Sequence, residues 1–168
     1  LAMLGGDKRL IDAHNRAVTV ALNQVESLAS TRVKKDGVSE TVLTGNLIIA
    51  RFNHDTSRAQ DPQIHTHSVV INATQNGDKW QTLASDTVGK TGFSETILAN
   101  RIAFGKIYQN SLRADVESMG YKTVDAGKNG MWEMEGVPVE SFSTRSQELL
   151  EAAGPDASLK SRDVAALD

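Results

Sequence analysis

Apolar residues recur at steps of three and four between Gly6 and Ser30, which predicts an amphipathic helix. The same spacing runs from Ser94 to Met119, where Gly120 supplies a common helix stop. We therefore expect two long helices. Further helices are expected at 144–153, which begins with a capping-box pattern and ends at a Gly-Pro pair, and from Ser158 onward.

Between the two long helices, β-branched and apolar residues predict strands, and Asp-Gly and Asn-Gly pairs predict the turns. The expected strands are 31–35, 41–54, 64–75 and 80–83, with a loop at 55–63 and a small hairpin of 121–124 with 131–134. These elements predict an α+β fold with a central antiparallel sheet flanked by helices. We expect residues 1–168 to form a single domain, truncated at both ends.

Composition sets broad limits on the class of protein. A hydrophobic content of 39% with 23% charged residues is ordinary for a globular protein, and no apolar run approaches the ~18 residues of a membrane span. The lack of cysteine excludes disulfides and thiolate metal sites and fits the cytoplasm. The net charge is −3, with the excess acid in 129–168. This argues against indiscriminate coating of duplex DNA and allows a local basic site.

Three of the four histidines lie within fourteen positions: His54, His65 and His67. Side chains at i and i+2 of a strand share one face, so His65 and His67 can reach a common point, and a short loop brings His54 alongside. Three neutral imidazoles with open coordination positions form a Lewis-acid site. Imidazole ligands alone leave the metal open and include zinc. A His₃ zinc hydrolase is therefore one alternative.

The second long helix carries a candidate surface for reading DNA. Arg101, Gly105 and Gln109 follow each other at four-residue steps, so a guanidinium and an amide flank a notch without a side chain. Arg101 lies within the apolar arc of this helix. Arginine and glutamine can hydrogen-bond guanine and adenine edges, although pairing of Arg101 with a core carboxylate is the alternative. Arg58 and Lys90 are candidate phosphate contacts.

Two other features predict no site. Gly89-Lys90-Thr91 is similar to the end of a P-loop, but Ala84 stands where that motif needs glycine, so we expect no ATP site. His14 lies in the first helix with Val18 at i+4, and we expect an ordinary surface or capping histidine.

Longer segments resemble a known family. Residues 54–58 (His-Asp-Thr-Ser-Arg) and 62–67 (Pro-Gln-Ile-His-Thr-His) resemble the metal-binding motif of conjugative relaxases of the TraI/TrwC (MobF) type. Segments 88–93 and 130–134 resemble the F-plasmid branch of that family. Thr66 takes a position that is hydrophobic in the wider His-hydrophobe-His superfamily. The similarity extends over the whole chain.

The resemblance implies a metal-dependent transesterase that nicks one DNA strand at a plasmid origin of transfer and keeps the DNA end on a tyrosine. It implies Mg²⁺ or Mn²⁺ on the histidines, single-stranded DNA beside the second long helix, and further domains such as a helicase on the same polypeptide. It also places the nucleophilic tyrosine upstream of Leu1. We expect Tyr108 to lie in the core and Tyr121 to be structural, so the chain alone is predicted to be inactive. A non-catalytic single-stranded DNA-binding module is the other alternative.

Overall fold

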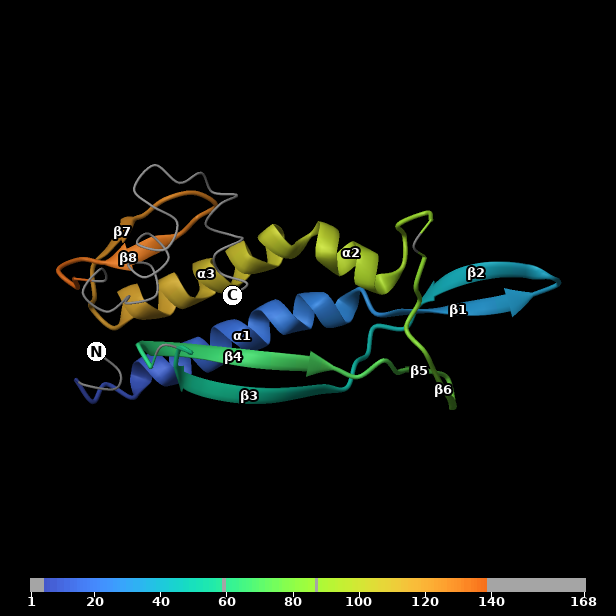
Figure 1. Cartoon of the computed structure of the whole chain (residues 1–168), viewed down its shortest axis with the longest axis horizontal. Helices are drawn as coiled ribbons and strands as arrows, with labels where there is room; N and C mark the ends of the chain where they lie inside the picture. The colour runs from blue at the N-terminus through green and yellow to red at the C-terminus, as the bar shows by residue number, and fades with distance from the viewer. Residues whose placement is uncertain (1–4, 59, 87, 139–168) are drawn as a thin grey trace. The chain divides into compact units, whose positions relative to one another are not determined.

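The computed structural model describes residues 5–58, 60–86 and 88–138 (Figure 1). The predicted helices at 144–153 and from Ser158 lie outside these residues. The described elements, in chain order, are α1 (Arg9–Ser27), β1 (Ser30–Lys35), β2 (Val38–Leu43), β3 (Ile49–Thr56), β4 (Pro62–Val70), β5 (Thr74–Asn76), β6 (Lys79–Gln81), α2 (Phe93–Ala99), α3 (Arg101–Ser118), β7 (Thr123–Asp125) and β8 (Trp132–Met134).

Contacts within the chain separate it into two compact units. The first contains the described residues of Leu1–Phe52 and Thr66–Glu135, and the second contains those of Asn53–His65 and Gly136–Asp168. The three helices of the described residues belong to the first unit. The end of the β3–β4 hairpin, where the two strands join, belongs to the second. The expectation of a single domain stays a prediction.

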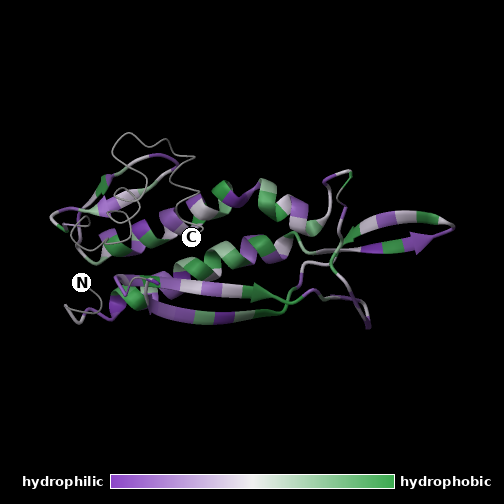
Figure 2. Ribbon diagram, in the orientation of Figure 1, coloured by the Kyte–Doolittle hydropathy of each residue, from purple (hydrophilic) through white to green (hydrophobic). Residues whose placement is uncertain are grey.

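α1 confirms the first predicted helix, with slightly shorter ends, and packs along α3 (Figure 1). Hydrophobic and hydrophilic residues alternate along both helices (Figure 2). The buried positions of α1 include Ala13 and Ala17, neither of which is exposed, and Val116 of α3 is also fully buried. Because alanine side chains are small, the two helices can approach closely. Arg16 forms an ion pair of 2.9 Å with Asp115 of α3 beside this contact.

The second long helix is interrupted, so the prediction of one continuous helix over 94–119 was wrong. α2 ends at Ala99, and α3 starts at Arg101. Asn100 between them has a φ of −101° and a ψ of 11°, outside the helical region. The Asn100 side chain donates to the Thr96 carbonyl at 2.9 Å. Asparagine competes with helix continuation through such local bonds. The predicted stop is present: Gly120 has a φ of +95°, and its N–H donates to the Glu117 carbonyl.

The strands of the described residues form four two-stranded sheets: β1–β2, β3–β4, β5–β6 and β7–β8. The α+β class is therefore confirmed. The described strands pair two by two and do not join into one central sheet. Predicted strand 41–54 divides into β2 and β3 because Gly45, with a φ of +65°, turns the chain between them. The side chain of Asn46 then bonds the N–H and C=O of Gln75 at 2.7 and 2.8 Å. Predicted strand 64–75 divides into β4 and β5.

Both turn signals and the small C-terminal hairpin are confirmed. Asp36 and Gly37 connect β1 to β2 with positive φ angles of 51° and 84°, as a tight hairpin turn requires. Gly77, with a φ of 60°, lies between β5 and β6, and β7 pairs with β8. No described helix has the length and apolar character to cross a membrane.

Candidate metal centre and nucleic-acid interface

The hairpin of β3 and β4 brings two of the three predicted metal ligands together. The rings of His54 and His65 are stacked, with centroids 5.3 Å apart and planes at 23°. The two strands run in opposite directions in Figure 1. Both strands extend further toward the connecting loop than predicted, to Thr56 and from Pro62, so the loop is short. Two imidazoles at this spacing can offer nitrogen atoms to one ion.

The His65 ring has a defined hydrogen bond. Its Nδ1 lies 3.0 Å from the Gln63 carbonyl oxygen. A carbonyl only accepts, so Nδ1 carries the proton and Nε2 holds the lone pair of the neutral ring. Metal-binding histidines commonly have this arrangement, because the second nitrogen fixes the tautomer and the ring orientation. The donor chemistry of His65 therefore fits a divalent metal ion.

His67 follows two residues later in β4, in the first compact unit, and its side chain is exposed. Among the described residues, no three His, Cys, Asp or Glu side chains are already gathered as a metal-holding group. Convergence of all three histidines on one ion stays a prediction. Arg58 lies on the loop between β3 and β4 and is exposed. That loop is closed by hydrogen bonds between Ser57 and Asp61, the Ser57 N–H donating to the Asp61 carbonyl at 2.9 Å.

Lys90 lies in a loop organised by a carboxylate. Asp86 accepts the Gly89 N–H and the Thr91 hydroxyl, both at 2.8 Å. These bonds hold the pKa of Asp86 below its usual range, with the Gly89 N–H as the largest cause. The Gly89 N–H and the Thr91 hydroxyl are thus directed at the Asp86 side chain. Lys90 itself is exposed, with a φ of +54°.

Arg101 is the first residue of α3 and is exposed, so its placement within an apolar arc was wrong. The arc assumed a helix that continued through Asn100. The Arg101 guanidinium donates to the Leu98 carbonyl at 2.9 Å. Gly105 is exposed, and an added Cβ would meet no atom within 4 Å. Arg101, Gly105 and Gln109 therefore lie at four-residue steps on one continuous helix, as predicted.

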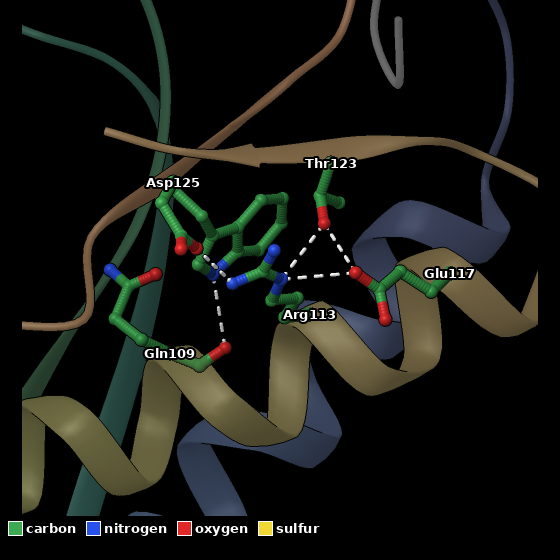
Figure 3. A network of polar contacts seen from close by, with 6 residues as sticks. Gln109, Arg113, Glu117, Thr123 and Asp125 are labelled. Carbon is green, nitrogen blue, oxygen red and sulfur yellow. Dashed lines mark hydrogen bonds and ion pairs between the residues drawn. The ribbon is translucent and has the colours of Figure 1, made fainter.

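Gln109 is half-buried, and its backbone is held by the β7–β8 hairpin (Figure 3). The Trp132 indole N–H donates to the Gln109 carbonyl at 3.1 Å. One turn further along α3, Arg113 bonds Glu117 at 3.0 Å, Thr123 at 2.8 Å and Asp125 at 2.5 Å (Figure 3). The carboxylates raise the pKa of Arg113, with Asp125 the larger cause. Sequence reasoning missed this network, although Arg113 and Glu117 stand at i and i+4 of one helix, a spacing typical of ion pairs.

Sequence reasoning also missed His14, which is not a surface residue. It is 6% exposed. Its Nδ1 lies 2.8 Å from the Tyr108 hydroxyl, and its Nε2 lies 2.7 Å from the Thr66 hydroxyl. Burial raises the pKa of Tyr108. Helical spacing could have indicated the burial, because His14 follows Leu10 by four positions and precedes Ala17 by three, and both are buried.

Tyr121, the other tyrosine of the chain, donates its hydroxyl proton to Asp7 at 2.7 Å. Arg9 and Tyr121 hold the pKa of Asp7 far below its usual range, with the Arg9 hydrogen bond as the larger cause. The same bond raises the pKa of Tyr121. Both tyrosines are therefore hydrogen-bonded: Tyr108 of α3 to His14 of α1, and Tyr121, which follows α3, to Asp7, which precedes α1.

Comparisons with known proteins bear on the family of this chain. The family model described as TrwC relaxase matches residues 1–167. The multifunctional conjugation protein TraI of Escherichia coli is 73% identical over all 168 residues, and TraI of strain K12 is 68% identical. The chain spans 10% of the length of each of these relatives.

Solved structures of the conjugative relaxase TrwC have the same fold. TrwC in complex with mutant OriT DNA has a TM-score of 0.83 at 33% identity, with 98% of this chain and 59% of that one covered. A metal-bound TrwC complex with OriT DNA has a TM-score of 0.82 at 32% identity, covering 98% and 57%. A copper-bound complex has the same score and identity, covering 98% and 56%. This chain belongs to the TrwC relaxase family.

Proposed function

We propose that this chain is the metal-binding and single-stranded DNA-binding part of a site- and strand-specific DNA nickase. The longer protein would act as a transesterase that starts conjugative plasmid transfer in the bacterial cytoplasm, with further domains such as a helicase. Membership of the TrwC relaxase family supports the activity. Complexes of TrwC with OriT DNA support the substrate. The observation that carries the proposal is the stacked pair of His54 and His65 in a chain of this family.

In this proposal His54, His65 and His67 hold one divalent ion, Mg²⁺ or Mn²⁺. The His65 tautomer supports it, because the proton on Nδ1 leaves the lone pair on Nε2. The metal-bound structure of TrwC supports the presence of an ion in the family. Such an ion would supply Lewis-acid polarisation of the scissile phosphate. The chain's own contribution is to hold the imidazoles on a short hairpin.

The DNA strand in this proposal lies along α3. Arg101 and Gln109 would read base edges across the notch at Gly105, because arginine matches guanine and glutamine matches adenine. The exposure of Arg101 and Gly105 supports access by a nucleic acid. Arg58 and Lys90 would contact phosphates, and both are exposed cations. Phosphate contacts give affinity, and base contacts give sequence preference.

The attacking hydroxyl in this proposal comes from a tyrosine of the longer protein outside these 168 residues. Both tyrosines of the chain are already hydrogen-bonded, Tyr108 to His14 and Tyr121 to Asp7. Residues 1–168 alone are therefore expected to give no covalent DNA product. A covalent product that disappears on Tyr108→Phe or Tyr121→Phe would contradict this part of the proposal.

The test uses the longer relaxase, Mg²⁺ or Mn²⁺, and a single-stranded origin oligonucleotide. We expect a shifted band that resists denaturant, its loss in His54→Ala and His65→Ala, and its retention in Lys35→Ala, an exposed residue of β1. A covalent product that forms equally with a chelator present would overturn the metal centre. Turnover of small esters with zinc would favour the zinc hydrolase, and binding without any nicking would favour a DNA-binding module.

A further inference from the structure

We propose that His14 is a positioning residue of the metal centre, which acts by holding Thr66 in the strand that carries His65 and His67. This inference rests on the proposed function, because it concerns the same metal site. His14 lies outside every motif that suggested the site, 51 positions before His65 along the chain. It is nevertheless one hydrogen bond away from the ligand-bearing strand.

The His14 ring joins α1, α3 and the part of β4 that belongs to the first compact unit. It extends from α1, its Nδ1 bonds the Tyr108 hydroxyl of α3 at 2.8 Å, and its Nε2 bonds the Thr66 hydroxyl of β4 at 2.7 Å. The Tyr108 ring meets it edge-on, with centroids 5.7 Å apart and planes at 80°. A neutral imidazole has one N–H and one lone pair, so one ring nitrogen donates its hydrogen bond and the other accepts one. His14 is thus fixed at both nitrogens.

Thr66 lies between His65 and His67, and its side chain points to the opposite face of β4. Successive side chains of a strand alternate between faces, and the bond to His14 shows that the Thr66 face is the one toward α1. His14 therefore holds the strand from behind, on the side away from the candidate ligands. Because threonine is branched at Cβ and stiff at χ1, a fixed hydroxyl also restrains the backbone that presents the neighbouring imidazoles.

β4 needs such a bond because apolar burial does not define its register. None of its described residues is fully buried, and Val69 is 53% exposed. A strand slipped by one residue would exchange its two faces, moving Thr66 outward and a histidine inward. Weakly buried strands resist this slip poorly. The directional bond from the buried ring of His14 selects one register, and metal ligands need positioning to within ~0.5 Å.

The test measures Mn²⁺ affinity of the longer relaxase by calorimetric titration and, separately, thermal unfolding without metal. Thr66→Val replaces the hydroxyl by a methyl group of similar size and is expected to weaken Mn²⁺ binding by about 10-fold or more, as outer-shell changes do. Thr66→Ser keeps the hydroxyl and should bind nearly as the unmodified protein. The matched control is Thr31→Val, since Thr31 is a buried threonine of β1 whose hydroxyl donates to the Thr82 carbonyl at 2.8 Å. It should lower the unfolding temperature and leave Mn²⁺ affinity unchanged.

A second pair of variants separates the two bonds of the ring. The amide of His14→Gln can reach the position of Nε2 and bond Thr66, whereas the shorter His14→Asn can reach only the position of Nδ1 and bond Tyr108. We expect His14→Gln to retain Mn²⁺ affinity better than His14→Asn. This comparison still decides the matter if Thr66→Val fails to fold.

The outcomes distinguish the two proposals. Unchanged Mn²⁺ affinity in Thr66→Val, together with equal affinities of His14→Gln and His14→Asn, would reduce His14 to a core residue and leave the metal centre standing. If the unmodified longer protein binds no Mn²⁺ and makes no covalent product, the proposed function fails, and this inference fails with it. The positioning role is supported if Thr66→Val and His14→Asn lose Mn²⁺ affinity while Thr66→Ser and His14→Gln retain it.

Discussion

The middle of β4 and the first half of α3 belong to the same compact unit and are built in opposite ways. Thr66 in β4 is held through its side chain by His14, which Tyr108 holds in turn. The first turns of α3 are open: Arg101, Ile102 and Gly105 are all exposed, and the Arg101 guanidinium bonds a carbonyl three residues back on its own segment. One region restrains side chains through distant partners, and the other presents them on a regular helix.

The difference matches what each region would bind. A metal ion needs its ligands in one geometry, so the strand behind them benefits from fixed hydrogen bonds. A single strand of nucleic acid adjusts to its binding surface, so an exposed helix with the right side chains suffices. Substitutions should therefore change local stability and metal binding in the first region, and DNA preference in the second.

The largest effect is expected from Tyr108→Phe. It leaves the buried Nδ1 of His14 without its phenol partner, and an unsatisfied buried polar group costs about 1–3 kcal/mol. Hydrogen exchange of the amides in α1 and β4 measures this loss locally in the longer protein. The matched variant Tyr121→Phe removes the bond to Asp7, where water can replace the phenol, and should cost less. Equal losses in both variants would show that the buried bond to His14 restrains its region no more than the more accessible bond to Asp7 does.

Exchanging the side chains at Arg101 and Gln109, as Arg101→Gln with Gln109→Arg, should change which sequence binds. A lost base contact costs about 1–3 kcal/mol at its own position. Binding to a panel of origin oligonucleotides with single-base changes gives the ranking. Lys106→Gln, at an exposed cation of α3, is the control and should weaken binding to all sequences alike. An identical ranking before and after the exchange would show that these residues do not read bases.

Gly105→Ala should separate helix stability from DNA binding. Because an added Cβ meets no atom within 4 Å, the exposed helix should gain about 0.5–1 kcal/mol. If DNA lies in the notch, the same methyl group lowers affinity for the origin oligonucleotide. Fluorescence anisotropy and hydrogen exchange of α3 provide the two measurements. Unchanged DNA affinity in a stabilised helix would remove the notch from the interface.

The smallest effect concerns acid pH and Asp7. Its pKa is lowered in the folded chain by Arg9 and Tyr121, so its contribution to stability is present above its unfolded pKa of about 3.9 and is lost as pH falls through the lower folded value. The unfolding temperatures of the unmodified protein and Asp7→Asn should therefore converge as pH falls from 5 toward 2. If the two unfolding temperatures differ by the same amount over that whole range, the lowered pKa of Asp7 is not the source of the stability.

Local signals in the sequence predicted most of the elements and the approach of His54 to His65. Positive-φ turn residues such as Gly37 and Gly77, and the helical spacing of α1, depend on neighbours along the chain, so they were correctly predicted. The pairing of His54 with His65 followed from strand geometry and a short loop. The break at Asn100 was missed because the apolar spacing continues across it, whereas the break itself goes with a side-chain bond from Asn100 to the Thr96 carbonyl.

What could not be predicted depends on contacts between distant segments. No spacing rule connects His14 to Thr66 or Trp132 to the Gln109 carbonyl, because each pair meets only after α1, β4, α3 and the β7–β8 hairpin are assembled. The burial of His14 was within reach of its helical position, yet its partners were not. The position of Arg101 was misjudged for a related reason, since its exposure depends on where α3 begins.

The two engaged tyrosines have a consequence for chemical labelling. A phenol reacts with electrophiles mainly as phenolate, and the pKa values of Tyr108 and Tyr121 are both raised, one by burial and the other by the Asp7 carboxylate. At a given alkaline pH these two rings are therefore ionised to a smaller extent than an ordinary tyrosine. This part of the polypeptide therefore offers a low background against which a reactive tyrosine elsewhere in the longer protein can be tagged selectively.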